Sequence, residues 1–236
     1  MNKLKRGIGV TDFRSTAMVL AFDPGGTTGW CAMGVRPESL LDLSVPLEKS
    51  LVYMDYGEIS SYGGDGSETW NGSSNYNMMG ENVAVAEMSR IAAERYQRCA
   101  IVLEDFVLDP NVNSGARELL SPVRLIAAFS YAMTIEHEIP LYERTFIQNR
   151  SPVKTTCTNE RLKEWGLFEP HPREHMRDAT RHAFYFLREA RGQTTKAREL
   201  RWRAWPHLFT DPVATLTGGK TKSRPKKINP RIEGLG

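Results

Sequence analysis

Blocks of hydrophobic residues predict strands in the first part of the chain. Two short apolar runs, residues 18–23 (MVLAFD) and 100–108 (AIVLEDFVL), have the length and the bulky side chains of buried strands. Residues 29–35 follow the first run after a glycine-rich turn and are predicted to pair with it as a hairpin. Weaker patterns predict strands over residues 51–59 and 139–146.

Helical spacing of apolar residues dominates the remaining segments. It predicts helices over residues 79–98, 121–138, 158–167 and 171–190, of which the last has the clearest pattern. Residues 60–78 are rich in Gly, Ser and Asn and are predicted to form an exposed loop.

The order of these elements predicts an α/β fold with a mixed sheet, in which an antiparallel meander is followed by parallel strands and flanked by helices. No GxGxxG motif follows the first strand, so a Rossmann fold is not expected. We expect an N-terminal extension over residues 1–17, one main domain over residues 18–190, and a basic, poorly packed C-terminal extension over residues 191–236.

Charge is distributed unevenly along the chain. The net charge is +3, but the residues from Arg188 to the end carry +8 and residues 1–187 therefore carry −5. A basic extension favours a polyanionic partner, and a solvated tail without a partner is the alternative. Neither a membrane span nor the apolar core of a signal peptide is evident, and the three cysteines form no CxxC pair, so we expect a soluble, cytoplasmic protein with reduced thiols.

Acidic residues stand where burial is costly. Asp23 ends the first apolar run, and Glu104 and Asp105 lie inside the second. A buried carboxylate needs a partner such as a metal ion, because leaving it unpaired costs several kcal/mol. Taken singly, Asp23 can also be a turn or helix-capping residue, and Glu104 an edge-strand residue that faces water. Successive residues of a strand point to opposite faces, and we take Glu104 as the candidate ligand and Asp105 as the second choice.

The last predicted helix offers further ligands. His175 and Asp178 are three residues apart and share a face, and His182 continues their stripe. A solvated polar face without function is the alternative. Together with Asp23 and Glu104, these residues can form an open cation site whose oxygen ligands favour Mg²⁺ or Mn²⁺, and the imidazole favours Mn²⁺. Two such ions can activate water and stabilise the leaving oxygen in phosphodiester hydrolysis.

Three motifs, "AFDPGGTTGW", "VLEDF" and "HMRDATRHAFYF", occur in this order within residues 18–190. Together they resemble the RuvC-like Holliday-junction resolvases of the RNase H-like superfamily, especially the phage-type members. The resemblance implies that Asp23, Glu104, His175 and Asp178 bind two catalytic Mg²⁺ or Mn²⁺ ions, although some members have Asp in place of His175. It also implies a homodimeric crossover-junction endodeoxyribonuclease of DNA recombination and repair, with branched DNA as its substrate.

The turn after the first strand contributes candidates for DNA contact. Gly25, Gly26 and Gly29 are expected to let the backbone enter the second strand without a Cβ clash. Thr27 and Thr28 are candidate hydrogen-bond donors to a phosphate.

Basic residues in two later segments are further candidates for DNA binding. Arg144, Arg150 and Lys154 lie in and after a predicted strand, and the resemblance makes Lys154 the candidate that holds the scissile phosphate. A solvated lysine is the alternative. The segment KARELRWRAWPH interleaves Trp202 and Trp205 with cations, which suits either stacking on unpaired bases or docking of the tryptophans on the protein body.

Three other functions remain open on the sequence. The DPGGTTG turn also resembles the phosphate-binding turn of actin-like ATPases and sugar kinases, but the chain is short for their second half-domain. A nuclease of the same fold can act on flaps, forks or RNA–DNA hybrids instead of four-way junctions. A non-catalytic DNA-binding protein is disfavoured because the acidic residues are present.

Overall fold

The computed structural model describes residues 14–60, 78–95, 98–105, 121–135, 144–168 and 174–209. The elements, in chain order, are β1 (Ala17–Asp23), β2 (Thr27–Val35), α1 (Pro37–Leu41), the 3₁₀ turn η1 (Leu47–Lys49), β3 (Leu51–Ser60), α2 (Met78–Arg90), the π-helical turn η2 (Ile91–Arg95), β4 (Ala100–Asp105), α3 (Ser121–Ile135), β5 (Thr145–Asn149), α5 (Arg150–Thr156), α6 (Asn159–Glu164), α7 (Glu174–Glu189) and α8 (Thr195–Ala204).

The strands form one five-stranded mixed sheet in the order β3-β2-β1-β4-β5. β1, β2 and β3 pair antiparallel, whereas β4 and β5 run parallel to β1. A tight turn joins β1 to β2, and a longer connection with α1 and η1 joins β2 to β3. The parallel strands β4 and β5 are reached by longer crossovers. The predicted α/β architecture is confirmed: an antiparallel meander followed by parallel strands forms one mixed sheet, which helices flank.

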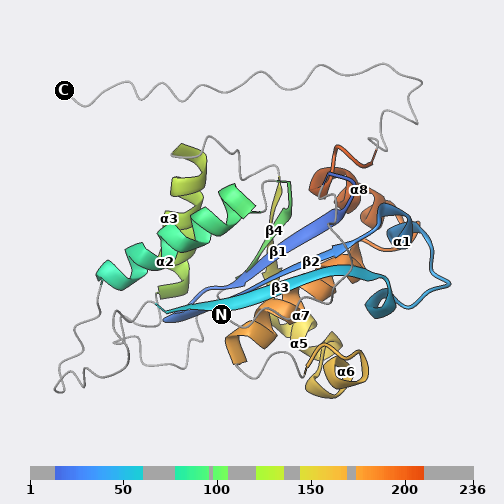
Figure 1. Cartoon of the computed structure of the whole chain (residues 1–236), viewed down its shortest axis with the longest axis horizontal. Coiled ribbons are helices and arrows are strands. Elements are labelled where there is room, and N and C mark those ends of the chain that lie inside the picture. Colours follow the sequence, from blue (N-terminus) through green and yellow to red (C-terminus); the bar gives the residue numbers. More distant parts are fainter. Residues whose placement is uncertain are drawn as a thin grey trace.

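Helices cover both faces of this sheet (Figure 1). One face carries α7, whose Ala179, Ala183 and Leu187 pack with odd-numbered residues of β1 and β2 in a buried cluster. The other face carries α2 and α3, which pack with Leu20 and Phe22 and their neighbours in a second cluster. Because strand side chains alternate between faces, every odd-numbered position of β1, Asp23 included, points toward α7.

The predicted strands over residues 18–23, 29–35 and 51–59 are found with small changes at their ends, and β4 covers the first part of the predicted 100–108. β5 begins at Thr145, so it overlaps the predicted strand 139–146 only at its end. The predicted loop over residues 60–78 and the N-terminal extension up to residue 13 fall almost wholly outside the described residues.

Residues 195–209 are packed, in contrast to the poorly packed extension expected there. α8 begins at the capping residue Thr194, whose hydroxyl accepts from the backbone N–H of Ala197 at 3.1 Å. Trp205 is fully buried, and its indole Nε1–H donates to the carbonyl of Met18 in β1 at 2.7 Å. Arg201 is also buried, and its guanidinium donates to the backbone carbonyls of Ala190 and Gly192. Residues 210–236 lie outside the described part of the chain.

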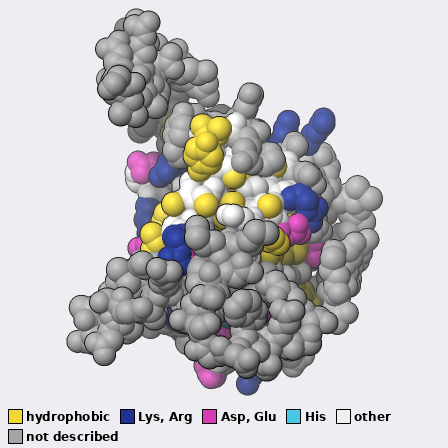
Figure 2. Space-filling view, turned by 90° about the vertical axis from the view of Figure 1, so that its left-hand side faces the viewer, with side chains coloured by type: hydrophobic (Ala, Val, Ile, Leu, Met, Phe, Trp, Pro, Cys, Tyr) yellow, Lys and Arg dark blue, Asp and Glu magenta, His cyan; other side chains and the backbone are white. Residues whose placement is uncertain are grey.

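The outer sides of α2 and α3 carry exposed hydrophobic residues. Figure 2 shows hydrophobic side chains gathered at the surface on the side of the molecule where these helices lie. The exposed large hydrophobic residues of the two helices are Val83, Val123, Tyr131 and Ile135. Within the described ranges, no helix has the length and hydropathy needed to cross a membrane.

Candidate metal centre

One row of residues across the sheet positions the candidate site. Asp23 of β1 is paired with Gly29 of β2, and Glu104 of β4 is paired with Gln148 of β5. The parallel register places Phe22 opposite Leu103, so Asp23 and Glu104 are the next positions on two adjacent strands. All four positions lie on the sheet face that α7 covers, because strand residues alternate between the two faces and these four fall on the same one.

Gly29 lets the beginning of α7 approach the sheet at this row. A Cβ atom at position 29 would lie 2.1 Å from the carbonyl oxygen of His175 and 2.8 Å from the backbone nitrogen of Met176. Only a residue without a side chain fits there. The structure therefore gives Gly29 a packing role instead of the expected turn role. Among the described glycines, only Gly166 and Gly192 have positive φ, so the turn after β1 does not depend on left-handed glycine conformations.

Asp23, Glu104 and Asp178 converge where α7 crosses the row. Each offers a carboxylate oxygen, and these oxygens all lie within 4.8 Å of one another. Their side chains are 14%, 10% and 3% exposed. Three carboxylates that the chain brings together from β1, β4 and α7 form a set of hard oxygen donors of the kind that Mg²⁺ and Mn²⁺ bind.

The negative charge of Asp23 is poorly balanced within the cluster. Burial, together with the negative charges of Glu104 and Asp178, raises the pKa of Asp23 to about 6, although a hydrogen bond from His175 acts in the opposite direction. A bound cation would relieve this repulsion, so the electrostatics of the site fit a divalent ion.

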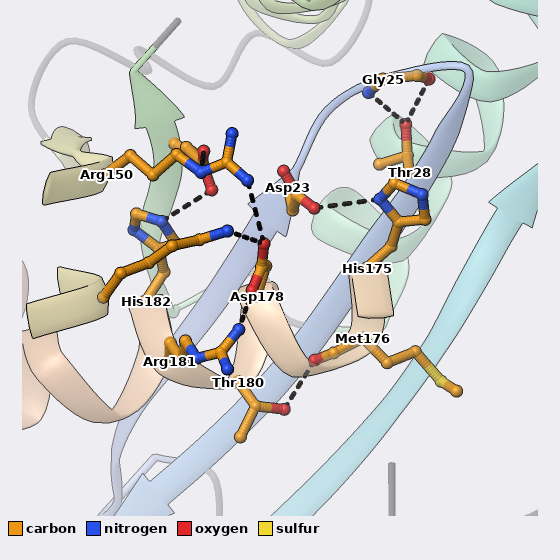
Figure 3. Close-up of polar contacts among 12 residues, drawn as sticks. Asp23, Gly25, Thr28, Arg150, His175, Met176, Asp178, Thr180, Arg181 and His182 are labelled. Carbon is orange, nitrogen blue, oxygen red and sulfur yellow. Dashed lines mark hydrogen bonds and ion pairs between the residues drawn. The ribbon is translucent and has the colours of Figure 1, made fainter. Parts of the chain in front are cut away.

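His175 contacts the cluster from its solvent side. Its Nδ1 lies 3.2 Å from Oδ2 of Asp23, and its side chain is about half exposed (Figure 3). The hydrogen bond to Asp23 raises the pKa of His175. The imidazole thus lies beside the three carboxylates, where it can hold or release a proton at the edge of the site.

Positively charged side chains surround Asp178. Its Oδ2 lies 2.7 Å from Nζ of Lys154 and 3.7 Å from Arg150, while its Oδ1 accepts from Arg181. Burial acts to raise the pKa of Asp178, but Lys154 and Arg181 outweigh it and hold the pKa below its usual range.

Helix α5 brings two of these cations to the site. Asn149, the last residue of β5, caps α5 by accepting from the backbone N–H of Ser151 at 2.9 Å, so the helix begins directly after the strand. Arg150 and Lys154 are four residues apart and therefore share the face toward the cluster. Both cations were expected as candidates for DNA contact, whereas the helix that carries them was not expected from the sequence.

A buried histidine that the sequence analysis left without a role completes the site. Nε2 of His182 lies 2.9 Å from Oε2 of Glu104, and Nδ1 lies 3.0 Å from Oε1 of Gln148. The spacing of four residues from Asp178 was the available signal, because it places His182 one turn further along the same helix face.

The other predicted residues lie away from the carboxylates. Asp105 points to the opposite sheet face from Glu104, as the alternation predicts. Arg144 precedes β5 and so lies at the opposite end of that strand from the cluster. Thr28 is fully buried and its hydroxyl bonds within the turn to the backbone of Gly25 at 3.3 Å, so it is not free to donate to a phosphate as expected. Thr27, at the start of β2, is half-buried.

Comparison with known proteins gave matches among solved structures alone. No family model and no curated protein matches the chain. The chain is similar to a structure titled T. thermophilus RuvC in complex with Holliday junction substrate, at 15% identity and a TM-score of 0.44, over 71% of this chain and 90% of that chain. It is also similar to the Thermus thermophilus RuvC structure, at 14% identity and a TM-score of 0.44, over 71% of this chain and 91% of that one.

Proposed function

We propose that this protein is a metal-dependent, structure-selective endonuclease that hydrolyses phosphodiester bonds in branched DNA, with the four-way Holliday junction as its substrate. The observation that carries the proposal is the convergence of Asp23, Glu104 and Asp178 beside the cations Arg150 and Lys154. Carboxylates of this kind bind metal ions, and adjacent cations suit a polyanionic substrate.

Asp23, Glu104 and Asp178 would hold two divalent ions, Mg²⁺ or Mn²⁺. Bound at these residues, such ions supply an activated water and stabilise the leaving oxygen of an in-line displacement. Hydrolysis forms a bond from the water oxygen to phosphorus and breaks the bond to the 3′ oxygen, leaving a 5′-phosphate and a 3′-hydroxyl. His175, exposed beside Asp23, either binds the second ion or positions the attacking water.

The DNA would meet the protein on the side of α5. Arg150 and Lys154 are partly exposed and already neutralise carboxylates of the cluster, so a phosphate entering the site would find both cations within reach. Arg144 and Thr27 stay candidates for more distant contacts. We further propose that the protein acts as a homodimer and belongs to a phage-type recombination system. Exposed hydrophobic residues on α2 and α3 offer a surface for a second copy.

A comparison of DNA substrates tests the proposed function. The full chain is incubated with Mn²⁺ and labelled four-way junctions, flaps, forks and linear duplexes at equal concentration. We expect the junction to be cut at least about tenfold faster than the other substrates, a difference of about 1.4 kcal/mol in the barrier. Equal cleavage of flaps, forks or hybrids would favour the broader nuclease, whereas ATP-dependent thermal stabilisation without any cleavage would favour the ATPase alternative.

Replacing Lys154 tests the DNA-facing side of the site. In Lys154→Met we expect cleavage at least about tenfold slower and a salt dependence of junction binding reduced by about one phosphate contact, because one cation at the scissile position is gone. Lys163→Met is the matched control, since Lys163, on α6, lies over the ring of Phe168 and has no ion pair with any of the three carboxylates among the described residues. Equal behaviour of the two variants in cleavage and filter-binding assays would contradict the role of Lys154.

A further inference from the structure

The two oxygens of Glu104 meet different kinds of partner. Oε2 contacts Nε2 of His182 at 2.9 Å, and Oε1 contacts Nε of Arg150 at 3.3 Å. The His182 side chain is 1% exposed, whereas that of Arg150 is 56% exposed. Figure 3 shows the side chains of His182 and Arg150 close to each other in this part of the site. One oxygen is therefore held by a buried group and the other by a group that solvent reaches.

The imidazole of His182 is itself held from a second strand. Its Nδ1 contacts Oε1 of Gln148 at 3.0 Å, and Gln148 is paired with Glu104 across β4 and β5. A carboxylate oxygen only accepts hydrogen bonds, so Nε2 of His182 donates to Glu104. With that proton on Nε2, Nδ1 accepts from the side-chain amide of Gln148, whose terminal oxygen and nitrogen exchange places when the amide is flipped. With both ring nitrogens bound, the ring cannot turn without breaking a buried hydrogen bond, which costs about 1–3 kcal/mol.

The two oxygens of Asp178 are likewise bound by one buried and one more exposed partner. Its Oδ1 accepts from the buried Arg181, which α7 also carries, and its Oδ2 faces the more exposed Lys154 of α5. In both residues one oxygen is bound by a buried side chain of α7 and the other by a cation of α5. The inner partners are fixed by the fold, and the outer ones can exchange with solvent ions.

We propose that His182 is a positioning residue that holds Oε2 of Glu104 and thereby leaves Oε1 as the oxygen available to a divalent cation. The inference rests on the proposed function insofar as Glu104 is taken to bind metal. His182 does not touch the reacting atoms in this assignment. It acts through Glu104, whose carboxylate would otherwise rotate to pair with Arg150 through either oxygen, and a fixed ligand binds metal more tightly than a rotating one.

Substitutions at His182 separate this role from a contribution to packing. His182→Leu removes the donor and keeps an apolar side chain of similar volume, whereas His182→Gln keeps an N–H donor at the place of Nε2. Thr180→Val is the matched control, because it deletes a buried polar group on the same helix whose hydroxyl donates to Met176, within α7. Mn²⁺ affinity of the full chain is measured by titration calorimetry without DNA.

We expect His182→Leu to lower the Mn²⁺ affinity about 10- to 100-fold, His182→Gln to recover at least half of that loss on a logarithmic scale, and Thr180→Val to bind Mn²⁺ as the wild type does. Equal losses in His182→Leu and Thr180→Val, or no recovery in His182→Gln, would overturn the proposal. If His182→Leu does not fold, His182→Asn serves in its place, because asparagine retains a polar group toward Gln148 but is too short to reach Glu104.

This experiment is independent of the nuclease assay. Wild-type protein that binds Mn²⁺ with the expected pattern of variants but cuts no branched DNA would refute the proposed function and leave the role of His182 standing. If the wild-type protein cuts junctions and His182→Leu binds Mn²⁺ as the wild type does, the role of His182 is refuted and the proposed function stands. Failure of the wild type to bind Mn²⁺ would overturn both.

Discussion

Asp23→Asn is expected to abolish junction cleavage, with a rate at least about 10³-fold below that of the wild type, while junction binding persists. The amide keeps the shape of the side chain but removes the negative charge that a divalent cation needs at the centre of the cluster. Binding should persist because the cations Arg150 and Lys154 are untouched. Gel-based cleavage with Mn²⁺ and a binding assay in Ca²⁺ measure the two properties separately. Full cleavage by the variant would remove Asp23 from the site.

The same substitution should stabilise the metal-free protein above about pH 6. The pKa of Asp23 rises from 3.8 to about 6 on folding, chiefly by burial, so the folded state binds a proton more readily than the unfolded chain. Ionised Asp23 therefore destabilises the fold fully above pH 6 and not at all below about pH 4. The free energy of unfolding is expected to rise by about 1–2 kcal/mol at neutral pH. This is less than the pKa shift of Asp23 alone implies, because the amide of asparagine pairs less well with His175 than the carboxylate does. Thermal unfolding at pH 7.5 and pH 4, with chelator present, checks the sign.

Gly29→Ala is expected to have the second largest effect, because the added methyl group collides with backbone and not with side chains. Its Cβ would lie 2.1 Å from the His175 carbonyl oxygen and 2.2 Å from the carbonyl carbon, so the start of α7 must move away from β2. His175 and Asp178 would move with it. A displacement on the order of 1 Å costs about 10²-fold in rate, and overpacking costs about 1–3 kcal/mol of stability.

Gly34→Ala is the matched control on the same strand. Its Cβ would meet the Sδ atom of Met18 at 2.3 Å and the side chain of Thr16, which lie at the end of β2 away from the carboxylates and can shift. We expect Gly34→Ala to lose some thermal stability and to keep junction cleavage within about threefold of the wild type, an energy below 1 kcal/mol. If both variants lose cleavage in proportion to stability, Gly29 has no special role in placing α7.

The inner strands were predictable because their apolar runs are short and bounded by polar or glycine-rich segments. β5 was misplaced because its sequence TFIQN is not an apolar run: Phe146 points inward, while Ile147 is half exposed on an edge strand. The more hydrophobic residues 139–142 drew the prediction upstream. α5 was missed because RSPVKTT has no helical stripe, and only the cap at Asn149 marks its start.

Asp23 and Glu104 could be named as candidates from the cost of burying a carboxylate, which needs only local sequence, and Asp178 from its spacing to His175 on one helix face. The link from Gln148 through His182 to Glu104 could not be predicted, because it depends on the register of β4 with β5 and on the path of α7 over both. For Trp202 and Trp205 the sequence left stacking on bases and docking on the protein body open, and Trp205 docks. Arg201 satisfies two backbone carbonyls and Trp205 a third, which makes their burial favourable in a segment expected to be poorly packed.

The contact between Trp205 and Met18 has a consequence for biosynthesis. Met18 lies in β1, the middle strand of the sheet, and its carbonyl accepts a hydrogen bond from the indole of a residue 187 positions later. A ribosome delivers β1 first, so this hydrogen bond can form only after Trp205 has emerged. During translation, β1 is therefore exposed to solvent on this side until the segment that carries Trp205 has been made.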